Sequence, residues 1–294
     1  MLTTTTVTST GVQLHVDLYE QAEPSAPTII FNHGGGGYSR LFIPLALILH
    51  EKGYNVVIPD QRGQGLSSGS RSHFTMGQFV QNIVDVATWV RARYTGPLFL
   101  AGGSIGGALT YNAAAGAPVD AIICHNLYDF GDPRDTLAVS IFALLADWPV
   151  IPFAMANITR FFAAILPGLR IPYRLLGRFD KMVDERVGEF YEQWQRDPYP
   201  IKWISLRYMA STFSTPPAIP YEQNTLPILV INQTRDKMVS PAVTRHNYER
   251  LSGPKHYAEI DYGHWAMGHG FEKTWGGIVD EFLQQVRAEK AVQA

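Results

Sequence analysis

Residues 98–111 read LFLAGGSIGGALTY, and this stretch decides how the rest of the sequence is interpreted. Its first four residues are apolar, as in a buried parallel strand, and the residues after the glycines are small and compatible with a helix. Between the two halves, residues 102–106 match the pattern G-x-S-x-G, in which a serine sits on a sharp turn from strand to helix. The stretch therefore predicts a strand, a tight turn that carries Ser104, and a helix.

The sequence holds a second match to this pattern, GLSSG at residues 65–69, which would present Ser67. A catalytic turn needs a buried strand directly before the serine and a helix directly after it. Ser67 lies in the polar stretch SSGSRSH, away from the nearest apolar run. We therefore predict Ser104 as a nucleophile and Ser67 as a member of a polar glycine loop.

Short apolar runs alternate with helical patterns in the first 126 residues and again after residue 224. Strands are predicted at residues 12–19, 27–33, 54–60, 97–104, 119–126, 226–232 and 255–263. Helices are predicted at residues 40–53, 105–117 and 240–253, after the capping-box pair Thr75 and Gln78, and around residues 279–286. This alternation predicts an α/β fold, with a mainly parallel sheet covered by helices on both faces.

The segment 127–224 interrupts this alternation. It is helical in character, rich in aromatic residues and punctuated by prolines, and it is too long for a simple crossover between strands. We therefore predict two units. Residues 1–126 and 225–294 form an α/β core, and residues 127–224 form an inserted helical cap subdomain that lies over Ser104.

The composition excludes several classes of protein. Hydrophobic residues make up 46% of the 294 residues, which is enough for a substantial core, and the formal net charge of −2 predicts no basic surface for nucleic acid. The single cysteine, Cys124, argues against a disulfide framework and a multi-cysteine metal site. No signal-peptide pattern and no run of about 20 apolar residues is visible. We expect a soluble, cytoplasmic protein that uses neither metal nor cofactor.

A serine hydroxyl is a weak nucleophile and requires a base, which is itself oriented by an acid. In sheets of this type the order along the chain is serine, acid, histidine, and the two partners follow later strands. Asp236 comes shortly after the strand predicted at 226–232, and His264 follows the last predicted strand. We therefore predict Asp236 as the acid and His264 as the base. The alternatives are Asp129 and Asp261 for the acid, and His269 and His33 for the base.

Acyl transfer also needs two hydrogen-bond donors for the negative charge that develops on the carbonyl oxygen. The backbone N–H of Ile105, directly after the serine, is the first predicted donor. The second is predicted in the loop 32–38, NHGGGGY, because consecutive glycines let backbone amides face a site without obstruction. Gly35 is preferred there and Gly36 is the alternative, and His33 is expected to brace this loop. No nucleotide-binding glycine motif gives the loop a competing role.

Five motifs, NHGGGG, PDQRGQGLSSG, GGSIGG, RDKMV and GHW, occur in an order and spacing that resemble the α/β-hydrolase superfamily. Residues 58–90 are most similar to the monoacylglycerol lipase and lysophospholipase-like branch, which is of the serine aminopeptidase type. The resemblance covers residues 10–126 and 225–290. For the site it implies the same set of residues: Ser104, Asp236, His264, Ile105 and the loop 33–36.

This resemblance implies a serine hydrolase that cleaves a small-molecule ester of a largely apolar acid through an acyl-enzyme. The chain departs from the family at Gly103, where such lipases often carry histidine, and in its longer glycine loop. Both departures bear on the substrate. Alternatives on the same three residues are hydrolysis of a carbon–carbon bond, a thioester or a lactone, and an alternative of another class is a hydrolase-like binding module without activity.

The segment 127–224 is expected to shape the substrate site. Its aromatic and apolar residues are candidates for an apolar slot, namely Trp148, Phe153, Phe161, Phe162, Leu166, Trp194, Trp203 and Phe213. Its arginines are candidates for binding a substrate carboxylate, namely Arg134, Arg160, Arg174 and Arg207. The apolar stretch 136–170 is a candidate for contact with a membrane surface.

Overall fold

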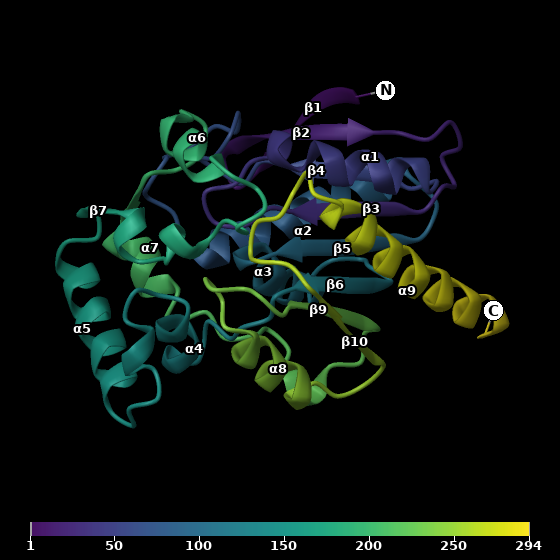
Figure 1. The fold of residues 1–294 in the computed structure, drawn as a ribbon. Helices are drawn as coiled ribbons and strands as arrows, with labels where there is room; N and C mark the ends of the chain where they lie inside the picture. Colours follow the sequence, from purple (N-terminus) through teal and green to yellow (C-terminus); the bar gives the residue numbers. More distant parts are fainter. Residues whose placement is uncertain (1, 294) are drawn as a thin grey trace.

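The computed structural model describes residues 2–293 and is built around one sheet of eight strands (Figure 1). In spatial order the strands are β1 (Leu2–Ser9), β2 (Val12–Tyr19), β4 (Asn55–Pro59), β3 (Thr28–Asn32), β5 (Leu98–Gly103), β6 (Ala121–His125), β9 (Ile228–Gln233) and β10 (Lys255–Ile260). β1 pairs antiparallel with β2, and β2 pairs antiparallel with β4, whereas all the other pairings are parallel. The predicted mainly parallel α/β sheet is therefore confirmed.

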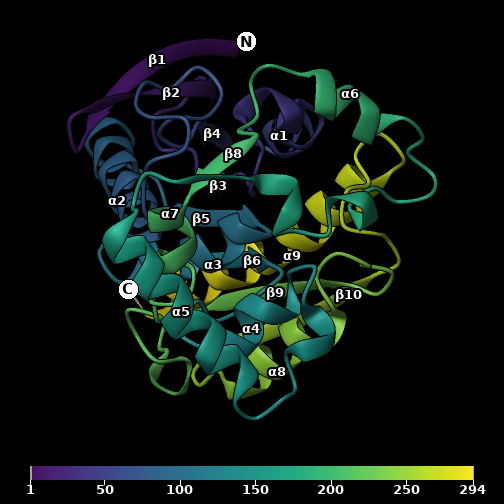
Figure 2. The same cartoon turned by 90° about the vertical axis from the view of Figure 1, so that its left-hand side faces the viewer.

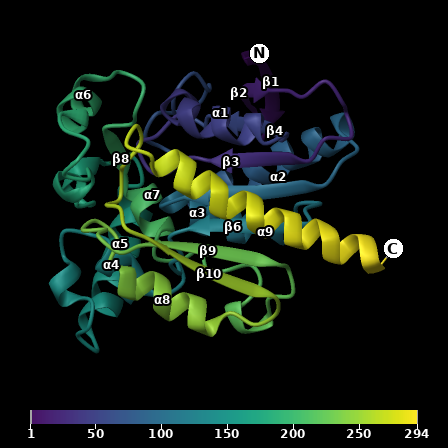
Figure 3. The ribbon, with the colours of Figure 1, turned by 45° about the vertical axis from the view of Figure 1, so that its right-hand side comes forward.

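Helices cover both faces of the sheet. Side chains along each buried strand alternate between the two faces, so both faces present apolar residues that need a covering layer. Ile29 and Phe31 of β3 pack in one apolar cluster with α1 (Ile43–Glu51) and α9 (Phe271–Gln293). Ile30 packs in the other cluster, whose helices are α2 (Met76–Arg93), α3 (Ile105–Ala114) and α8 (Pro241–Arg250). Figure 3 shows α9 running along the length of its face of the sheet.

The residues between β6 and β9 gather beyond one end of the sheet, at the carboxyl ends of the parallel strands (Figures 1 and 2). Their helices are α4 (Pro133–Ala138), α5 (Ile151–Ile165), α6 (Phe190–Arg196) and α7 (Leu206–Ser211). A small antiparallel pair joins β7 (Arg170–Pro172) to β8 (Trp203–Ser205). The remaining helical segments are short 3-10 helices, at Ser39–Phe42, Ala143–Leu145, Tyr173–Leu175, Phe179–Lys181 and Tyr221–Gln223.

The structure adds strands that the sequence pattern does not predict: β7 and β8 within the segment 127–224, and β1 in the main sheet. β1 is the threonine-rich start of the chain, and it forms a hairpin with β2 through the tight turn at Thr10 and Gly11, both of which have positive φ. Threonine is β-branched and favours strands, but four threonines in succession do not show the alternation that marks a half-buried strand. Two predicted boundaries also move, because the segment 39–42 is a 3-10 turn before α1 and the last strand ends at Ile260.

The capping box predicted at the start of α2 is confirmed. The Thr75 hydroxyl accepts a hydrogen bond from the Gln78 N–H (3.2 Å), and the Gln78 side-chain oxygen accepts one from the Thr75 N–H (3.0 Å). The helix that follows buries Phe79, Ile83 and Val90 against the sheet. The cap therefore sets the starting residue of a helix that covers a large part of one core.

We expect Thr75→Ala to lower the free energy of unfolding by about 1 kcal/mol, because it leaves a backbone N–H at the helix start without its partner. Thr88→Ala is the matched control, since the exposed Thr88 hydroxyl only donates to the Val84 carbonyl of its own helix. Urea unfolding of the two variants checks this. Equal losses in both variants would contradict a stabilising role for the cap.

Candidate active site

Ser104 occupies a strained turn between β5 and α3, as the sequence predicts. Its φ of 57° and ψ of −128° lie in a region that residues with side chains rarely adopt. The turn is closely packed: a Cβ atom at Gly102 would overlap the carbonyl oxygen of Gly106, and one at Gly106 would overlap the carbonyl oxygen of Asn32. Glycines two residues before and after the serine are therefore a steric requirement of this turn.

The second match to the pattern has a structural role. The Ser67 hydroxyl donates a hydrogen bond to the Asp60 carbonyl (2.7 Å) and accepts one from the His15 N–H (2.8 Å). The Ser67 hydroxyl is thus hydrogen-bonded, as donor and as acceptor, to the backbone of two neighbouring segments. Ser67 is buried in a loop that closes against β2, as expected for a polar glycine loop.

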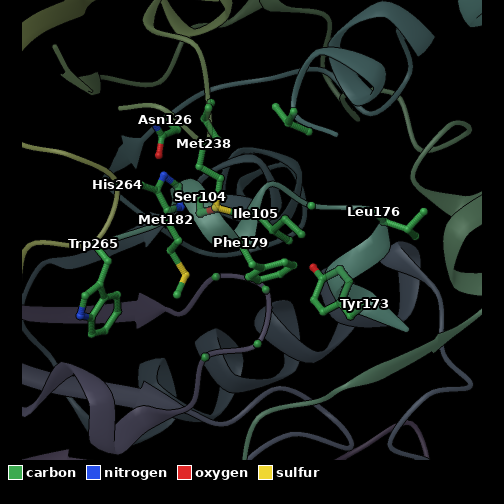
Figure 4. Close-up of a pocket in the computed structure, with 18 of the residues that line it drawn as sticks. Ser104, Ile105, Asn126, Tyr173, Leu176, Phe179, Met182, Met238, His264 and Trp265 are labelled. Atoms are coloured by element: carbon green, nitrogen blue, oxygen red, sulfur yellow. The ribbon is translucent and has the colours of Figure 1, made fainter. Parts of the chain in front are cut away.

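Asp236 and His264 meet at the carboxyl ends of β9 and β10. The His264 Nδ1 lies 2.7 Å from Asp236 Oδ2, and the other carboxylate oxygen accepts hydrogen bonds from the N–H groups of Met238 and Val239, each at 2.8 Å. The carboxylate is therefore fixed in position. It holds the imidazole by Nδ1, so the Nε2 edge of the ring points away from Asp236. Within residues 2–293 the Nε2 atom of His264 has no hydrogen-bond partner, and Figure 4 shows the ring beside Ser104.

The alternative acids are held elsewhere. Asp129 accepts a hydrogen bond from the Gly131 N–H (2.6 Å) and pairs with Arg250 (3.3 Å). Asp261 comes directly after the last strand, is exposed, and pairs with Arg235 at 3.2 Å. Neither carboxylate contacts an imidazole, so Asp236 is the acid that the fold brings to His264.

The alternative bases are also accounted for. His33 is buried and braces the glycine loop, since its Nε2 accepts from the Gln61 N–H (3.0 Å) and its Nδ1 donates to the Gly34 carbonyl (2.9 Å). Burial lowers the pKa of His33, which keeps this ring neutral and suited to one donor and one acceptor role. His269 is exposed, and its carbonyl accepts from Tyr262.

The glycine loop lies directly against the serine. A Cβ atom at Gly34 would lie 3.0 Å from the Cβ of Ser104, and one at Gly35 would lie 3.1 Å from the Cδ1 of Ile105. Ile105 is the first residue of α3, so its N–H has no partner within the helix. Gly36 is engaged differently, because its carbonyl accepts a hydrogen bond from the Trp194 indole (2.8 Å). This arrangement places Gly35 closer than Gly36 to Ile105.

A cavity of about 190 Å³ opens at Ser104 and His264 and extends beneath the segment 127–224 (Figure 4). Its walls are predominantly aromatic, aliphatic and methionine side chains. Among the lining residues that the structure describes, none is Asp, Glu, Lys or Arg, so the arginines considered from the sequence do not reach it. Within residues 2–293 no cluster of three His, Cys, Asp or Glu side chains could hold a metal ion.

The predicted apolar slot is only partly right. Trp194 and Phe213 line the cavity, but six of the eight predicted side chains are exposed on the outside: Trp148, Phe153, Phe161, Phe162, Leu166 and Trp203. An amphipathic pattern identifies an apolar face but does not say whether that face turns toward a cavity or toward solvent. The cavity is lined instead by residues that the pattern did not single out, among them Tyr128, Tyr173, Phe179 and Met238.

Tyr128 is a site residue that sequence reasoning missed. It follows β6 by three residues, is buried, and lines the same cavity as Ser104. Burial raises the pKa of Tyr128 well above its usual value, so the hydroxyl stays protonated. Its position just past the carboxyl end of a central strand was the available signal.

Asp184 is a second missed residue, and it joins the segment 127–224 to both loops that carry the acid and the base. Its carboxylate accepts a hydrogen bond from the Gly263 N–H (2.6 Å) and pairs with Arg235 (3.1 Å). Gly263 directly precedes His264, and Arg235 directly precedes Asp236. One buried carboxylate therefore restrains the backbone next to each of the two paired side chains.

Backbone pairing strengthens this junction. The Asp184 N–H donates to the Trp265 carbonyl (2.9 Å), and the Trp265 N–H donates to the Met182 carbonyl (2.8 Å). The hydrogen bond from Arg186 is the main cause that holds the pKa of Asp184 well below its usual range. Asp184 is therefore charged at neutral pH and has a partner for each oxygen.

The comparisons with known proteins identify the family of this chain. A model of the family described as serine aminopeptidase, S33, matches residues 23–265, which include Ser104, Asp236 and His264. The chain belongs to this family of α/β-hydrolases. It is thus a hydrolytic enzyme, and the fold and the branch expected from its motifs are confirmed. No match is found among curated proteins.

Solved structures of α/β-hydrolases with several activities share this fold. A monoacylglycerol lipase from Paleococcus ferrophilus is 20% identical over 93% of this chain and 99% of its own, with a TM-score of 0.71. A soluble variant of monoglyceride lipase from Saccharomyces cerevisiae is 16% identical over 97% of each chain, with a TM-score of 0.73. An enol-lactonase from Burkholderia xenovorans LB400 is 21% identical over 95% of this chain and 100% of its own, with a TM-score of 0.63.

We expect Asp184→Asn to lower the free energy of unfolding of this α/β-hydrolase by about 2 kcal/mol, because it weakens charge-assisted hydrogen bonds to buried partners. Amide hydrogen exchange at residues 261–267 should rise in the same variant. Glu185→Gln is the matched control, since Glu185 is exposed and pairs only with Lys237, and it should change neither measurement. If exchange at residues 261–267 is unchanged in Asp184→Asn, the carboxylate does not restrain the His264 loop.

Proposed function

We propose that this enzyme hydrolyses carboxylic esters of largely apolar acids, with Ser104 as nucleophile, His264 as base and Asp236 as acid. The observation that carries the proposal is the fixed pair of Asp236 and His264, with a free imidazole Nε2 beside a serine on a strained turn. A strained serine held at the start of a helix, next to an oriented imidazole, is the arrangement that nucleophilic acyl transfer requires.

In the proposed mechanism, His264 Nε2 takes the proton of the Ser104 hydroxyl as the oxygen attacks the ester carbonyl. The backbone N–H groups of Ile105 and Gly35 stabilise the oxyanion. The imidazolium then gives its proton to the leaving alcohol, and an acyl-enzyme remains on Ser104. Water, deprotonated by His264, attacks the acyl group and releases the acid. Asp236 keeps the Nδ1–H of the imidazole oriented and stabilises its positive charge.

The uncharged cavity supports an apolar acyl group. Its walls offer aromatic and methionine contacts to a chain and no charged partner for a carboxylate. On the side of Ile105 that faces away from His264, most of the cavity wall comes from the segment 127–224. We therefore treat residues 127–224 as a cap and residues 1–126 and 225–294 as the core that carries the chemistry. The cap then sets the length and shape of the acyl group that binds.

We expect wild-type enzyme to hydrolyse p-nitrophenyl esters and to react with a fluorophosphonate probe at Ser104. Ser104→Ala should abolish labelling, and Asp236→Asn should lower kcat by about four orders of magnitude, an effect typical of removing the orienting acid. Asp129→Asn is the matched control, because it changes the rival acid in the same way, and it should stay within about threefold of wild type.

Different outcomes separate the rival functions. Labelling without hydrolysis of any ester would favour a carbon–carbon, thioester or lactone substrate on the same residues. A wild-type protein that takes no label, in a preparation where a known serine hydrolase does, would favour a binding module without activity. An Asp129→Asn variant as impaired as Asp236→Asn would contradict the assignment of the acid.

We also propose that the cap rests on a lipid surface. Helix α5 and the segments directly before and after it expose a group of apolar side chains: Phe142, Leu144, Trp148, Val150, Phe153, Ile158, Phe161, Phe162, Ile165, Leu166 and Leu169. Phe142 also lines the cavity, so it joins this exposed surface to the cavity wall. An ester delivered from a lipid surface would therefore reach Ser104 without crossing a polar barrier. No helix within residues 2–293 is both long and apolar enough to span a membrane.

Replacing Phe161 and Ile165 together by serine should weaken co-sedimentation with phosphatidylcholine vesicles roughly tenfold or more, because both side chains are more than half exposed on one face of α5. Hydrolysis of a soluble short-chain ester should not change. Leu47→Ser removes an exposed apolar residue from α1, which lies outside this surface, and serves as the control. Wild-type protein that does not sediment with vesicles would refute contact with lipid.

A further inference from the structure

Trp194 of α6 reaches the glycine loop from the segment 127–224. Its indole N–H donates a hydrogen bond to the Gly36 carbonyl at 2.8 Å. The ring lies directly on the loop, because a Cβ atom at Gly36 would approach Trp194 Cζ2 to 2.7 Å. Gly36 also has a φ of 71°, a conformation that favours glycine. The loop and the ring therefore fit together only with glycine at position 36.

The Trp194 side chain is held firmly in this position. The residue is buried, and its ring stacks on Phe179 with the centroids 5.0 Å apart and the planes 12° apart. The Lys202 ammonium lies 3.7 Å from the centre of the Trp194 ring and also donates to the Trp194 carbonyl. A side chain that packing already fixes loses little conformational entropy in its hydrogen bond, so it is suited to hold another group in place.

The hydrogen bond at Gly36 is the first of two that follow each other through the loop. The Gly36 carbonyl shares a peptide group with the Gly37 N–H, and that N–H donates to the Gly34 carbonyl at 3.1 Å. The Gly34 carbonyl in turn shares a peptide group with the Gly35 N–H, which has no hydrogen-bond partner within residues 2–293. We call these two peptide groups, 36–37 and 34–35, the glycine relay. It leads from the Trp194 indole to the Gly35 N–H.

The glycine relay sets the direction of the Gly35 N–H. Both of its peptide bonds are trans, so the C=O and N–H of each group point in opposite directions. The Gly34 carbonyl is held by the Gly37 N–H and by His33 Nδ1, which lies at 2.9 Å. The Gly35 N–H therefore points away from His33. A second effect is on strength, because hydrogen bonds in series polarise one another, and a donor on the Gly36 carbonyl makes each following N–H a better donor.

We propose that Trp194 is a positioning residue for the oxyanion hole, because its indole N–H orients and polarises the glycine relay that ends at the Gly35 N–H. Trp194 acts through the loop and not by contact with the reacting atoms. This inference rests on the proposed function, since it concerns how one oxyanion donor of that mechanism is held. It gives the segment 127–224 a part in the reaction besides shaping the acyl site.

Two substitutions separate the hydrogen bond from the packing of the ring. Trp194→Phe keeps a six-membered ring but has no donor. Trp194→His fills less space, but its Nε2–H can take the place of the indole N–H, because both nitrogens lie two bonds from Cγ in a five-membered ring. A role of the hydrogen bond predicts that histidine retains activity that phenylalanine loses. A role of packing alone predicts the opposite order.

With a p-nitrophenyl ester of an apolar acid, we expect Trp194→Phe to lower kcat and kcat/KM equally, by about tenfold, the value of one hydrogen bond between neutral groups. Equal losses mark an interaction made only in the transition state. A trifluoromethyl ketone, which forms a tetrahedral oxyanion with the serine, should bind this variant about tenfold more weakly, whereas affinity for the product acid should not change. Trp194→His should stay within about threefold of wild type in all of these measurements.

Two further variants are matched controls. Trp203→Phe makes the same exchange at a half-exposed tryptophan of the same segment and should leave both kinetic constants unchanged. Tyr38→Phe removes the 2.7 Å hydrogen bond from Tyr38 to Asp197, which joins the end of the same loop to the residue directly after α6 but lies outside the glycine relay. It should lower kcat by less than about threefold, as for a substitution away from the reacting groups.

Three results would overturn the proposal: a folded Trp194→Phe variant with wild-type kcat, a Trp194→His variant more impaired than Trp194→Phe, or an equal loss in Tyr38→Phe, which would point to docking of α6 in general. If Trp194→Phe does not fold, Trp194→His still decides, because a tenfold loss of kcat in that variant would contradict the relay. An active wild-type enzyme with any of these results loses only the role of Trp194. A wild-type enzyme that hydrolyses no ester and takes no fluorophosphonate label loses the proposed function as well.

Discussion

The close approach of backbone segments at Ser104 is the constraint on which the rest of the site depends. β5 turns into α3 so sharply that Gly102 and Gly106 have no room for a side chain, and the serine between them takes a positive φ. This strain is stabilised by the packing of a central strand and a buried helix on both sides. As a result, the serine lies at the carboxyl end of a central strand, directly before the N–H of Ile105, which has no partner within α3.

Around this turn, the fold brings together groups from distant parts of the chain at the carboxyl end of the parallel strands. β5, β9 and β10 are parallel, so the loops that carry Ser104, Asp236 and His264 leave from the same end. The segment 127–224 adds a restraint of its own through Asp184, whose carboxylate bonds to Gly263 and Arg235, the residues directly before His264 and Asp236. Sheet topology thus decides which loops meet, and the buried Asp184 carboxylate holds two of them in place.

The cavity extends to two sides of Ser104 that have different surroundings. Under the segment 127–224, most of the wall residues are aromatic, aliphatic or methionine side chains, and the outer face of α5 is apolar as well. On the face that α1 and α9 cover, the cavity is lined by Phe31, Phe42, Phe271 and Trp275, which belong to the apolar core of that face. The difference follows from position, because one side is built by a single chain segment and the other by the core of the sheet.

Local patterns were sufficient to predict much of this molecule. The G-x-S-x-G turn, the capping box of Thr75 and Gln78, the parallel strands and the order of Ser104, Asp236 and His264 all depend on neighbouring residues or on chain order, and short-range physics governs both. β1 was missed because a run of threonines has no alternation. The positions of Tyr128 and Asp184 and the outward orientation of six apolar residues of the segment 127–224 were decided by tertiary structure alone. Each of these depends on what lies opposite a side chain in space, and no periodicity along the chain contains that information.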